Sequence, residues 1–158
     1  MCRVGTVAAD VAEIGARNRS SLARLESLGH ALRDDELARV IDPPWTPGAL
    51  FAHIAFWDRF VLERWRLAHE RGDRRPAPLD GEVWDRANLA ALPQWLALPP
   101  RAAVAECLAA GRELDDLIGG LDREVVAELV AEGGQRLVDR SIHRGEHIGT
   151  LGSAFPDH

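Results

Sequence analysis

Apolar residues recur at intervals of three and four over most of this chain, and this spacing restricts its fold more than any other feature. A long amphipathic segment runs from Thr6 to about Leu32, with Thr6 as a candidate N-cap. Similar segments follow at 47–71, 100–119 and 135–151. The sequence contains no strand-like alternation and no hairpin signal. The pattern therefore predicts an all-α protein with four long helices.

The second of these segments has the clearest start and stop. Pro43-Pro44 ends any preceding helix, and Thr46 followed by Pro47 is typical of an N-cap with proline at the first helical position. Gly72 is expected to follow its last residue. Besides its main apolar stripe, the segment carries a second apolar set on another side, formed by Phe51, Ala55 and Leu62. Such a helix is either central to a bundle or buried in a subunit contact.

The segments between the long helices are less regular. Residues 34–44 and 73–78 are polar or proline-bearing, and we expect loops there. Residues 81–98 are interrupted by Pro93, which predicts a short helix or helical turn and an irregular crossover packed by its tryptophans. Residues 121–134 are expected to connect the third helix to the last. These lengths favour a four-helix bundle, formed as a single domain over 1–158, with a long crossover between its second and third helices.

Composition narrows the class of protein. A chain of 158 residues that is 46% apolar and 28% charged is typical of one globular domain. Its net charge of −6 provides no broad basic surface for phosphates, so we expect no nucleic-acid partner. No apolar run approaches the length of a membrane span, and no signal-like segment opens the chain. The expectation is a cytoplasmic protein without a membrane partner.

The residue types also exclude some chemistries. All 19 basic residues are arginine and tyrosine is absent, which excludes a lysine Schiff base and a tyrosine general acid. Two cysteines, Cys2 and Cys107, are too few for a disulfide framework and fit a reducing compartment. Cys107 lies on the apolar side of the third helix, where we expect an inert buried thiol.

A histidine pair near the C-terminus is the main candidate for chemistry. In the stretch His143-Arg144-Gly145-Glu146-His147, the two histidines stand at i and i+4, about 6 Å apart on one side of a helix. Two imidazoles at this spacing can bind one metal ion. His53, set among apolar residues of the second helix, is the candidate third ligand. The alternative is two solvated surface histidines and a core histidine bonded to a backbone carbonyl.

The positions of these histidines around their helices place them beside the core. At about 100° per residue, His143 and His147 lie about 80–120° from the centre of their apolar stripe, and His53 about 60° from its own. All three are thus expected at the rim of the bundle, facing a cleft. A three-histidine site leaves a coordination position for water or substrate, which is the catalytic rather than the structural arrangement.

Three stretches, taken in order and separation, resemble one known family over nearly the whole chain. They are Trp45-Thr46 with Leu50 and His53-Ile54-Ala55-Phe56-Trp57-Asp58; Trp84-Asp85-Arg86-Ala87-Asn88; and His143, His147, Ile148 and Leu151. Together they resemble the DinB-like (DinB/YfiT) superfamily. The second stretch is similar to the crossover of its mycothiol-dependent maleylpyruvate isomerase-like branch.

The resemblance implies a four-helix bundle that holds a divalent metal, often nickel or zinc, on His53, His143 and His147. Members with known roles include S-transferases and isomerases that use mycothiol, bacillithiol or glutathione. Members frequently form homodimers through helix faces, which would account for the second apolar side of the second helix. No DNA binding is implied, in agreement with the acidic charge.

Three further residues are candidate neighbours of the site. Glu146 lies between the histidines in sequence but about 60° or more from either around the helix, which favours a solvated carboxylate over a group that orients a ligand. For Asp58 and Arg140 we weigh a place beside the ligands against a surface salt bridge, and favour the salt bridge.

Three functions are compatible with these residues. The first is a metal-dependent thiol S-transferase or isomerase in which the metal activates a small thiol, with mycothiol the first candidate, for attack on a small electrophile. The second is a non-catalytic, stress-associated bundle that binds a metal or a small ligand. The third is an inverted zinc protease, because 143–147 fits the H-x-x-E-H pattern with Glu146 as general base. That pattern is short, and no strand is expected that could support a peptide substrate.

Overall fold

The computed structural model describes residues 11–79 and 81–158, and these residues form helices joined by short connections. The helices are α1 (Val11–Ala31), α2 (Asp34–Leu37), α3 (Pro47–Arg71), α4 (Gly81–Ala97), α5 (Pro100–Gly119), α6 (Arg123–Ala131) and α7 (Ser141–Ala154), with a 3-10 turn at Gln135–Leu137. Within the described ranges, the only strand-like pairing is an isolated bridge between Asp42 and Trp45. The all-α prediction is therefore confirmed. The proposed cap Thr6 and Cys2 lie outside the described residues.

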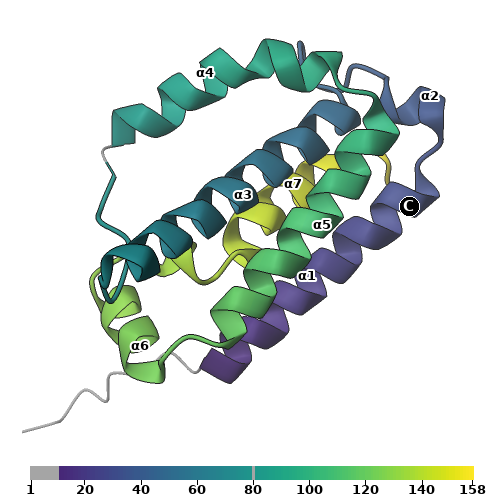
Figure 1. Cartoon of the computed structure of the whole chain (residues 1–158). Coiled ribbons are helices and arrows are strands. Elements are labelled where there is room, and N and C mark those ends of the chain that lie inside the picture. The colour runs from purple at the N-terminus through teal and green to yellow at the C-terminus, as the bar shows by residue number, and fades with distance from the viewer. Residues whose placement is uncertain (1–10, 80) are drawn as a thin grey trace, which may run out of the picture.

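The four long helices α1, α3, α5 and α7 pack side by side as a bundle, as Figure 1 shows. Helix α3 contacts both α5 and α7, and α1 contacts the same two helices. Helix α4 lies outside this bundle and packs on α3, so it forms the long crossover between the second and third bundle helices. The predicted bundle and its crossover are both present.

Helix α3 begins and ends where its sequence indicates. The Thr46 hydroxyl accepts a hydrogen bond from the Ala49 amide at 3.1 Å, and Pro47 occupies the first helical position, where no N–H is needed. Gly72 ends the helix with φ 76°, a left-handed conformation that glycine adopts without steric cost.

The second apolar side of α3 is covered within the chain. Phe51, Ala55 and Leu62 are all buried in the bundle core, so α3 is the central helix of the fold. This side therefore offers no free surface for a subunit contact. The homodimer implied by the family resemblance remains a prediction, without the support that this apolar side had given it.

The crossover is more regular than we expected. Residues 81–97 form one continuous helix, although Pro93 lies inside it. A proline in a helix interior removes a hydrogen bond and costs about 3 kcal/mol in an isolated helix. Tertiary packing offsets this cost, because Ala91 and Trp95 on either side of the proline are buried in the core. The expectation of a short helix with an irregular crossover was therefore wrong.

The connection between α5 and α7 also differs from the prediction. Helix α6 lies within 121–134, capped by the Asp122 carboxylate, which accepts from the Glu124 amide at 2.7 Å. It buries three apolar side chains, Val125, Val126 and Leu129, in a core cluster with Trp65. Helix α7 begins at Ser141, later than the expected residue 135, and a 3-10 turn occupies Gln135–Leu137 instead. Residues 34–37, expected as loop, form the short helix α2.

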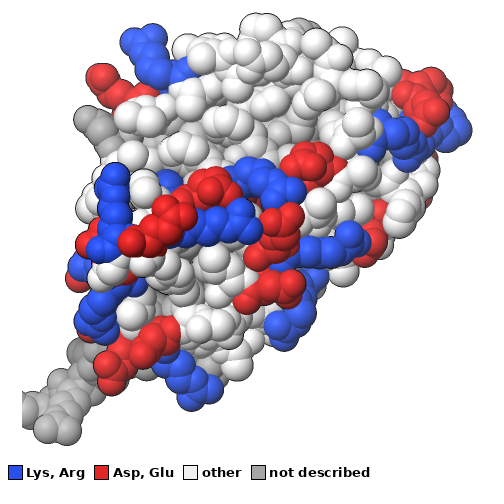
Figure 2. All heavy atoms as spheres, in the orientation of Figure 1, with Lys and Arg blue, Asp and Glu red and all other residues white. Residues whose placement is uncertain are grey.

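The surface carries charges of both signs. Figure 2 shows basic and acidic side chains alternating over α3 and α5, where Arg59 pairs with Glu106 and Glu113, and Arg66 pairs with Glu113. This face therefore presents no large area of one sign. Among the described residues, no helix combines the length and the apolarity needed to cross a bilayer.

Candidate metal centre

The structure brings His53, His143 and His147 together, at the point where α3 and α7 approach each other. The Nε2 atom of His143 lies 3.0 Å from Nε2 of His53 and 3.2 Å from Nε2 of His147. One potential ligand atom from each of the three residues falls within 4.8 Å of the others. Imidazoles from two helices thus converge on one point.

The spacing of these nitrogens fits a transition metal ion. Tetrahedral coordination with metal–nitrogen bonds of about 2.0–2.1 Å separates neighbouring ligand atoms by about 3.3 Å. The observed separations of 3.0 and 3.2 Å come close to that value. Three imidazoles also leave a fourth coordination position for a ligand from the cavity described below.

Burial keeps the imidazoles neutral, which histidine must be before it can bind a metal. His53 is only 6% exposed, and burial, with the nearby His147 and Arg140, lowers its pKa to about 3. Burial also lowers the pKa of His143, together with the neighbouring Arg140, and the pKa of His147. At neutral pH all three rings are therefore uncharged.

His53 is held mainly by aromatic packing. Its ring makes edge contacts with Trp45 and Trp95, at centroid distances of 5.6 and 4.9 Å. Its Nδ1 atom is buried and has no hydrogen-bond partner among the described residues. In most metal-binding histidines the second ring nitrogen donates a hydrogen bond to an oxygen. The ring of His53 is instead oriented by the shape of its surroundings, since it lacks such a bond among the described residues.

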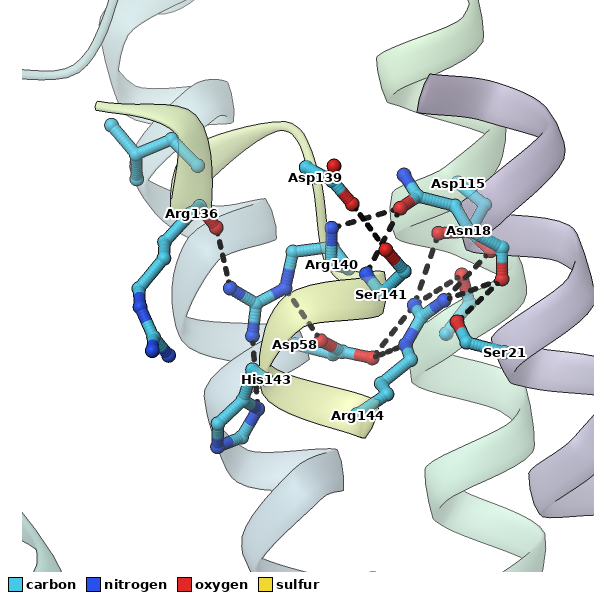
Figure 3. A network of polar contacts seen from close by, with 12 residues as sticks. Asn18, Ser21, Asp58, Asp115, Arg136, Asp139, Arg140, Ser141, His143 and Arg144 are labelled. Carbon is cyan, nitrogen blue, oxygen red and sulfur yellow. Dashed lines mark hydrogen bonds and ion pairs between the residues drawn. The ribbon is translucent and has the colours of Figure 1, made fainter. Parts of the chain in front are cut away.

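His143 is oriented by Arg140, as Figure 3 shows. The Nη2 atom of Arg140 lies 3.3 Å from Nδ1 of His143. A guanidinium can only donate, so Nδ1 of His143 accepts and the proton of the neutral ring resides on Nε2. That proton faces the Nε2 atoms of His53 and His147. Binding of a metal at this point therefore requires its release.

Behind His143 lies a buried group of two arginines and two aspartates, drawn in Figure 3. The Asp58 carboxylate accepts from Nε of Arg140 at 2.9 Å and from Nε and Nη2 of Arg144 at 3.0 and 2.8 Å. Arg144 also donates to both carboxylate oxygens of Asp115, at 2.9 and 3.0 Å. Two positive and two negative charges balance in this interior, as buried ions require.

This group corrects our expectation for Asp58 and Arg140. The side chain of Asp58 is 0% exposed and that of Arg140 is 4% exposed, so their ion pair is a buried one and not a surface salt bridge. The physical reason lies in Arg144, whose charge also needs a partner in the core. Its own exposure is 0%, and Asp58 bridges the two arginines.

The start of α7 is fixed by a residue of α1. The Asn18 side-chain oxygen accepts from the backbone amides of Arg140 and Ser141 at 2.8 and 3.1 Å, while its nitrogen donates to the Val138 carbonyl at 2.8 Å. These amides begin α7 and have no helical partners of their own. Asn18 thus caps α7 from a neighbouring helix and sets where its histidines lie.

Arg144, Asp115 and Asn18 were missed in the sequence analysis, although a signal was present for Arg144. It lies three residues after Ser141 and four before Ile148, on the inward-facing stripe of α7. A charge at such a position indicates a buried partner of opposite sign. The same reasoning applies to Asp58, which lies seven residues after Phe51 and seven before Trp65, both fully buried.

Glu146 lies on the exposed side of α7, as we expected. Its carboxylate pairs with Arg136, which holds the pKa of Glu146 below its usual range. An exposed carboxylate that is already paired is poorly placed to serve as a general base. The geometry therefore does not favour the protease interpretation of 143–147.

The three histidines open onto a cavity of about 860 Å³. Its wall is largely aromatic and aliphatic, with Trp45, Trp57 and Trp84 among the lining residues. The Trp57 indole donates to the Asn88 side chain at 2.8 Å, which joins α3 to α4 along this wall. Cavities of this size accept small organic molecules. Trp95 packs as an anchor, as we expected, whereas these three tryptophans line the cavity.

Cys107, the remaining candidate for chemistry, is inert in this fold. It is buried in the core, and burial raises the pKa of its thiol well above the usual range. A thiol in this state is a poor nucleophile and a poor metal ligand at neutral pH. The expectation of a structural cysteine is confirmed.

Comparison with known proteins gives one finding. No curated protein and no solved structure matches the chain at the required level of significance. The model of the DinB superfamily matches residues 17–144, which is well over half of the chain. Of the residues described above, the matched region includes two of the three histidines, His53 and His143, and the whole buried charged group with Asn18, whereas His147 lies just beyond it. With its helical bundle and converging histidines, the chain belongs to the DinB superfamily.

Proposed function

We propose that this protein binds a divalent transition metal through Nε2 of His53, His143 and His147 and transforms a small molecule in the adjoining cavity. One observation carries this proposal: three neutral imidazoles converge at the wall of a cavity of about 860 Å³. The family resemblance supports zinc or nickel, and imidazole nitrogens suit both ions. A metal held there would supply Lewis acidity and would lower the pKa of a bound thiol or water.

The reaction class that we propose is thiol-dependent S-transfer or isomerisation. The thiol would release its S–H proton to solvent, and its sulfur would then form a bond to an electrophilic carbon of the second substrate. In S-transfer a leaving group would depart from that carbon with the bonding electron pair. In isomerisation the π electrons of a C=C bond would shift to the neighbouring atoms, and they would return when the C–S bond breaks and releases the thiol. The resemblance of residues 84–88 to the mycothiol-dependent branch supports mycothiol as the thiol. The absence of lysine and tyrosine agrees with a reaction that depends on the histidine site rather than on amine or phenol chemistry.

The surrounding residues have definite roles in this proposal. Arg140 fixes the ring of His143 through Nδ1, and Asp58 in turn fixes Arg140. The indoles of Trp45 and Trp57 line the cavity beside the histidines, and a substrate seated against them would displace water, which strengthens electrostatic interactions there. Asn18 places the beginning of α7, and with it both of its histidines.

The test measures metal content and thiol conjugation on protein prepared without a histidine tag. We expect about one equivalent of zinc or nickel in the wild type, loss of that metal in His143→Ala, and loss of conjugation in parallel. His30→Ala is the matched control, because His30 is an exposed histidine of α1. Full turnover in a His143→Ala protein that holds no metal would rule out the proposed mechanism.

A second function is favoured by the apolar wall of the cavity. A stress-associated bundle could bind a small apolar ligand there without catalysis. In that case ligand binding would persist after the metal is removed, and no thiol would be consumed. If the wild type hydrolysed a peptide and Glu146→Gln abolished that activity, the protease interpretation would be restored.

A further inference from the structure

The cavity extends from the histidines along α3 toward its C-terminal half. Arg64 lines it, eleven residues after His53 on the same helix. Eleven residues advance the helix by about 16 Å and bring the side chain back to within about 20° of the same face. Trp57 and Val61 lie between them on this face and also line the cavity. The two ends of the cavity are thus marked by a histidine site and an arginine.

Arg64 differs from the other arginines of the cavity in its lack of an acidic partner. Arg75 lies 2.7 Å from Glu132, Arg136 pairs with Glu146, and Arg140 pairs with Asp58. Within the described part of the chain, no carboxylate lies within ion-pair distance of Arg64.

The surroundings of Arg64 leave its charge uncompensated. Its Nη2 donates to the carbonyl of Ala77, and its guanidinium carbon lies 5.9 Å from the centroid of the Phe60 ring. The side chain is half-buried, and this loss of hydration lowers the pKa of its guanidinium. A half-buried cation of this kind gains from an anionic ligand. The remaining acidic group of the cavity, the exposed Asp42, precedes α3 and lies near its opposite end.

The wall next to Arg64 is apolar. Leu79 and Trp84 line the cavity from the crossover side, opposite Trp57 and Val61 of α3. Trp84 lies against Trp57, with 4.6 Å between ring centroids. A ligand seated here would bury hydrocarbon or aromatic surface against this wall, and would have one polar group at each end.

We propose that Arg64 binds the carboxylate of a small amphipathic anion, whose apolar body lies against the wall formed by Trp57, Trp84 and Leu79 and whose far end reaches the three histidines. The arginine fork matches a carboxylate with two parallel hydrogen bonds. A phosphate dianion would call for further cations, and the other arginines of the cavity are already paired. The proposal names the substrate class of the proposed function and rests on that function only for the histidine end.

The Arg64 end is tested first on metal-free protein, so that the result does not depend on the metal. The probes are octanoate and 1-octanol, which share an apolar body and differ in charge. Their binding is followed through tryptophan fluorescence, since three of the five tryptophans line the cavity. We expect octanoate to bind at least tenfold more tightly than 1-octanol.

Variants then test whether Arg64 causes the difference in affinity between the two probes. Arg64→Gln should weaken octanoate binding about tenfold and leave 1-octanol binding unchanged, whereas Arg64→Lys, which keeps the charge but loses the fork, should weaken octanoate binding by less. Arg59→Gln is the matched control, because Arg59 lies on α3, pairs with Glu106 and does not line the cavity. Equal binding of the two probes, or equal weakening of both by Arg64→Gln, would overturn the proposal. The comparison of probes on wild-type protein gives this answer even if a variant fails to fold.

A second arm separates this proposal from the metal function. Protein loaded with zinc is titrated with 8-mercaptooctanoate and with octanoate. If both ends of the cavity act as proposed, the thiol-bearing probe binds more tightly, and its advantage disappears in His143→Ala. If the advantage is absent while Arg64→Gln still weakens octanoate, the metal function has failed and the carboxylate site stands.

Discussion

Both sides of α7 carry buried polar side chains, but on one side these are uncharged and on the other they are paired charges. One side presents His143 and His147 to the cavity, and the other presents Arg144 to the core between α3 and α5, with Arg140 at the helix start. The histidines are uncharged at neutral pH, because burial lowers their pKa values. The arginines cannot lose their charge, so they require Asp58 and Asp115.

This difference explains why the site is open on one side only. Neutral imidazoles can bind a metal ion through a ring nitrogen, although Nε2 of His143 must first release its proton. The arginine side has its charges balanced and its donors engaged, and it serves as a fixed support. The histidines, whose charge depends on pH, face the cavity, whereas the permanently charged arginines face the aspartates.

The largest effect should come from breaking the charged side. In Asp58→Asn, Arg140 and Arg144 would remain buried beside a neutral amide, and loss of one partner from a buried ion pair costs about 3–5 kcal/mol. We expect a loss of this size in the free energy of unfolding, measured by urea denaturation. Metal affinity should fall as well, because Arg140 would no longer hold His143.

Glu113→Gln is the control for this experiment. Glu113 pairs with Arg59 and Arg66 on the surface, where solvent screens the interaction. We expect a much smaller change in stability. If Asp58→Asn were as mild as Glu113→Gln, the buried charges would not support the fold as described.

Acid should act on the histidine side. In the unfolded chain histidine has a pKa near 6.5, whereas in the folded protein the pKa of His53 is about 3 and those of His143 and His147 are also lowered. Below pH 6.5 the unfolded state therefore binds more protons, and stability falls as pH falls toward 3. His53 contributes up to about 1.4 kcal/mol per pH unit between these two pKa values, and His143 and His147 act in the same direction.

Urea denaturation of metal-free protein at pH 7, 6 and 5 measures this slope. His53→Gln should reduce it by the share of one histidine, since glutamine binds no proton. An unchanged slope in His53→Gln would mean that the ring is protonated as readily in the folded protein as in the unfolded chain.

The smallest loss of stability is expected at Asn18, which fixes the start of α7. Asn18→Ala removes the acceptor for the amides of Arg140 and Ser141, and loss of a helix cap costs about 1–2 kcal/mol. Ser27→Ala is the control, because Ser27 bonds only to the Ala23 carbonyl on the exposed side of α1. Thermal unfolding should show a clear drop for Asn18→Ala and little for Ser27→Ala. Equal drops would argue against a cap in trans.

Much of the fold could be predicted because it depends on the spacing of apolar residues and on backbone preferences that act locally along the chain. The start and end of α3 follow from Thr46, Pro47 and Gly72, whose backbone preferences act over a few residues. The continuous helix α4 could not be predicted, since Pro93 opposes it locally and only the burial of Trp95 against the bundle outweighs that preference. Helix α6 was missed because its three buried residues gain their stability from contacts distant in sequence.

Part of the candidate site could likewise be predicted from the sequence, and part of it could not. The pair His143 and His147 is determined by its spacing on one helix, and this was visible in the sequence. The burial of Asp58 was not foreseen, although its position on the inward side of α3 indicated it. Which arginines Asp58 would meet depends on the register between α3 and α7, and the spacing of residues on one helix contains no such information.

By itself the sequence determined the helical class, the limits of α3 and the chemical types of the ligands, because these depend on interactions within a few residues along the chain. Only the tertiary structure decided that His53 meets the C-terminal pair, that two arginines share Asp58, and that Arg64 lacks an acidic partner among the described residues. The reason is that helix positions are set by the packing of the whole core, to which every buried side chain contributes.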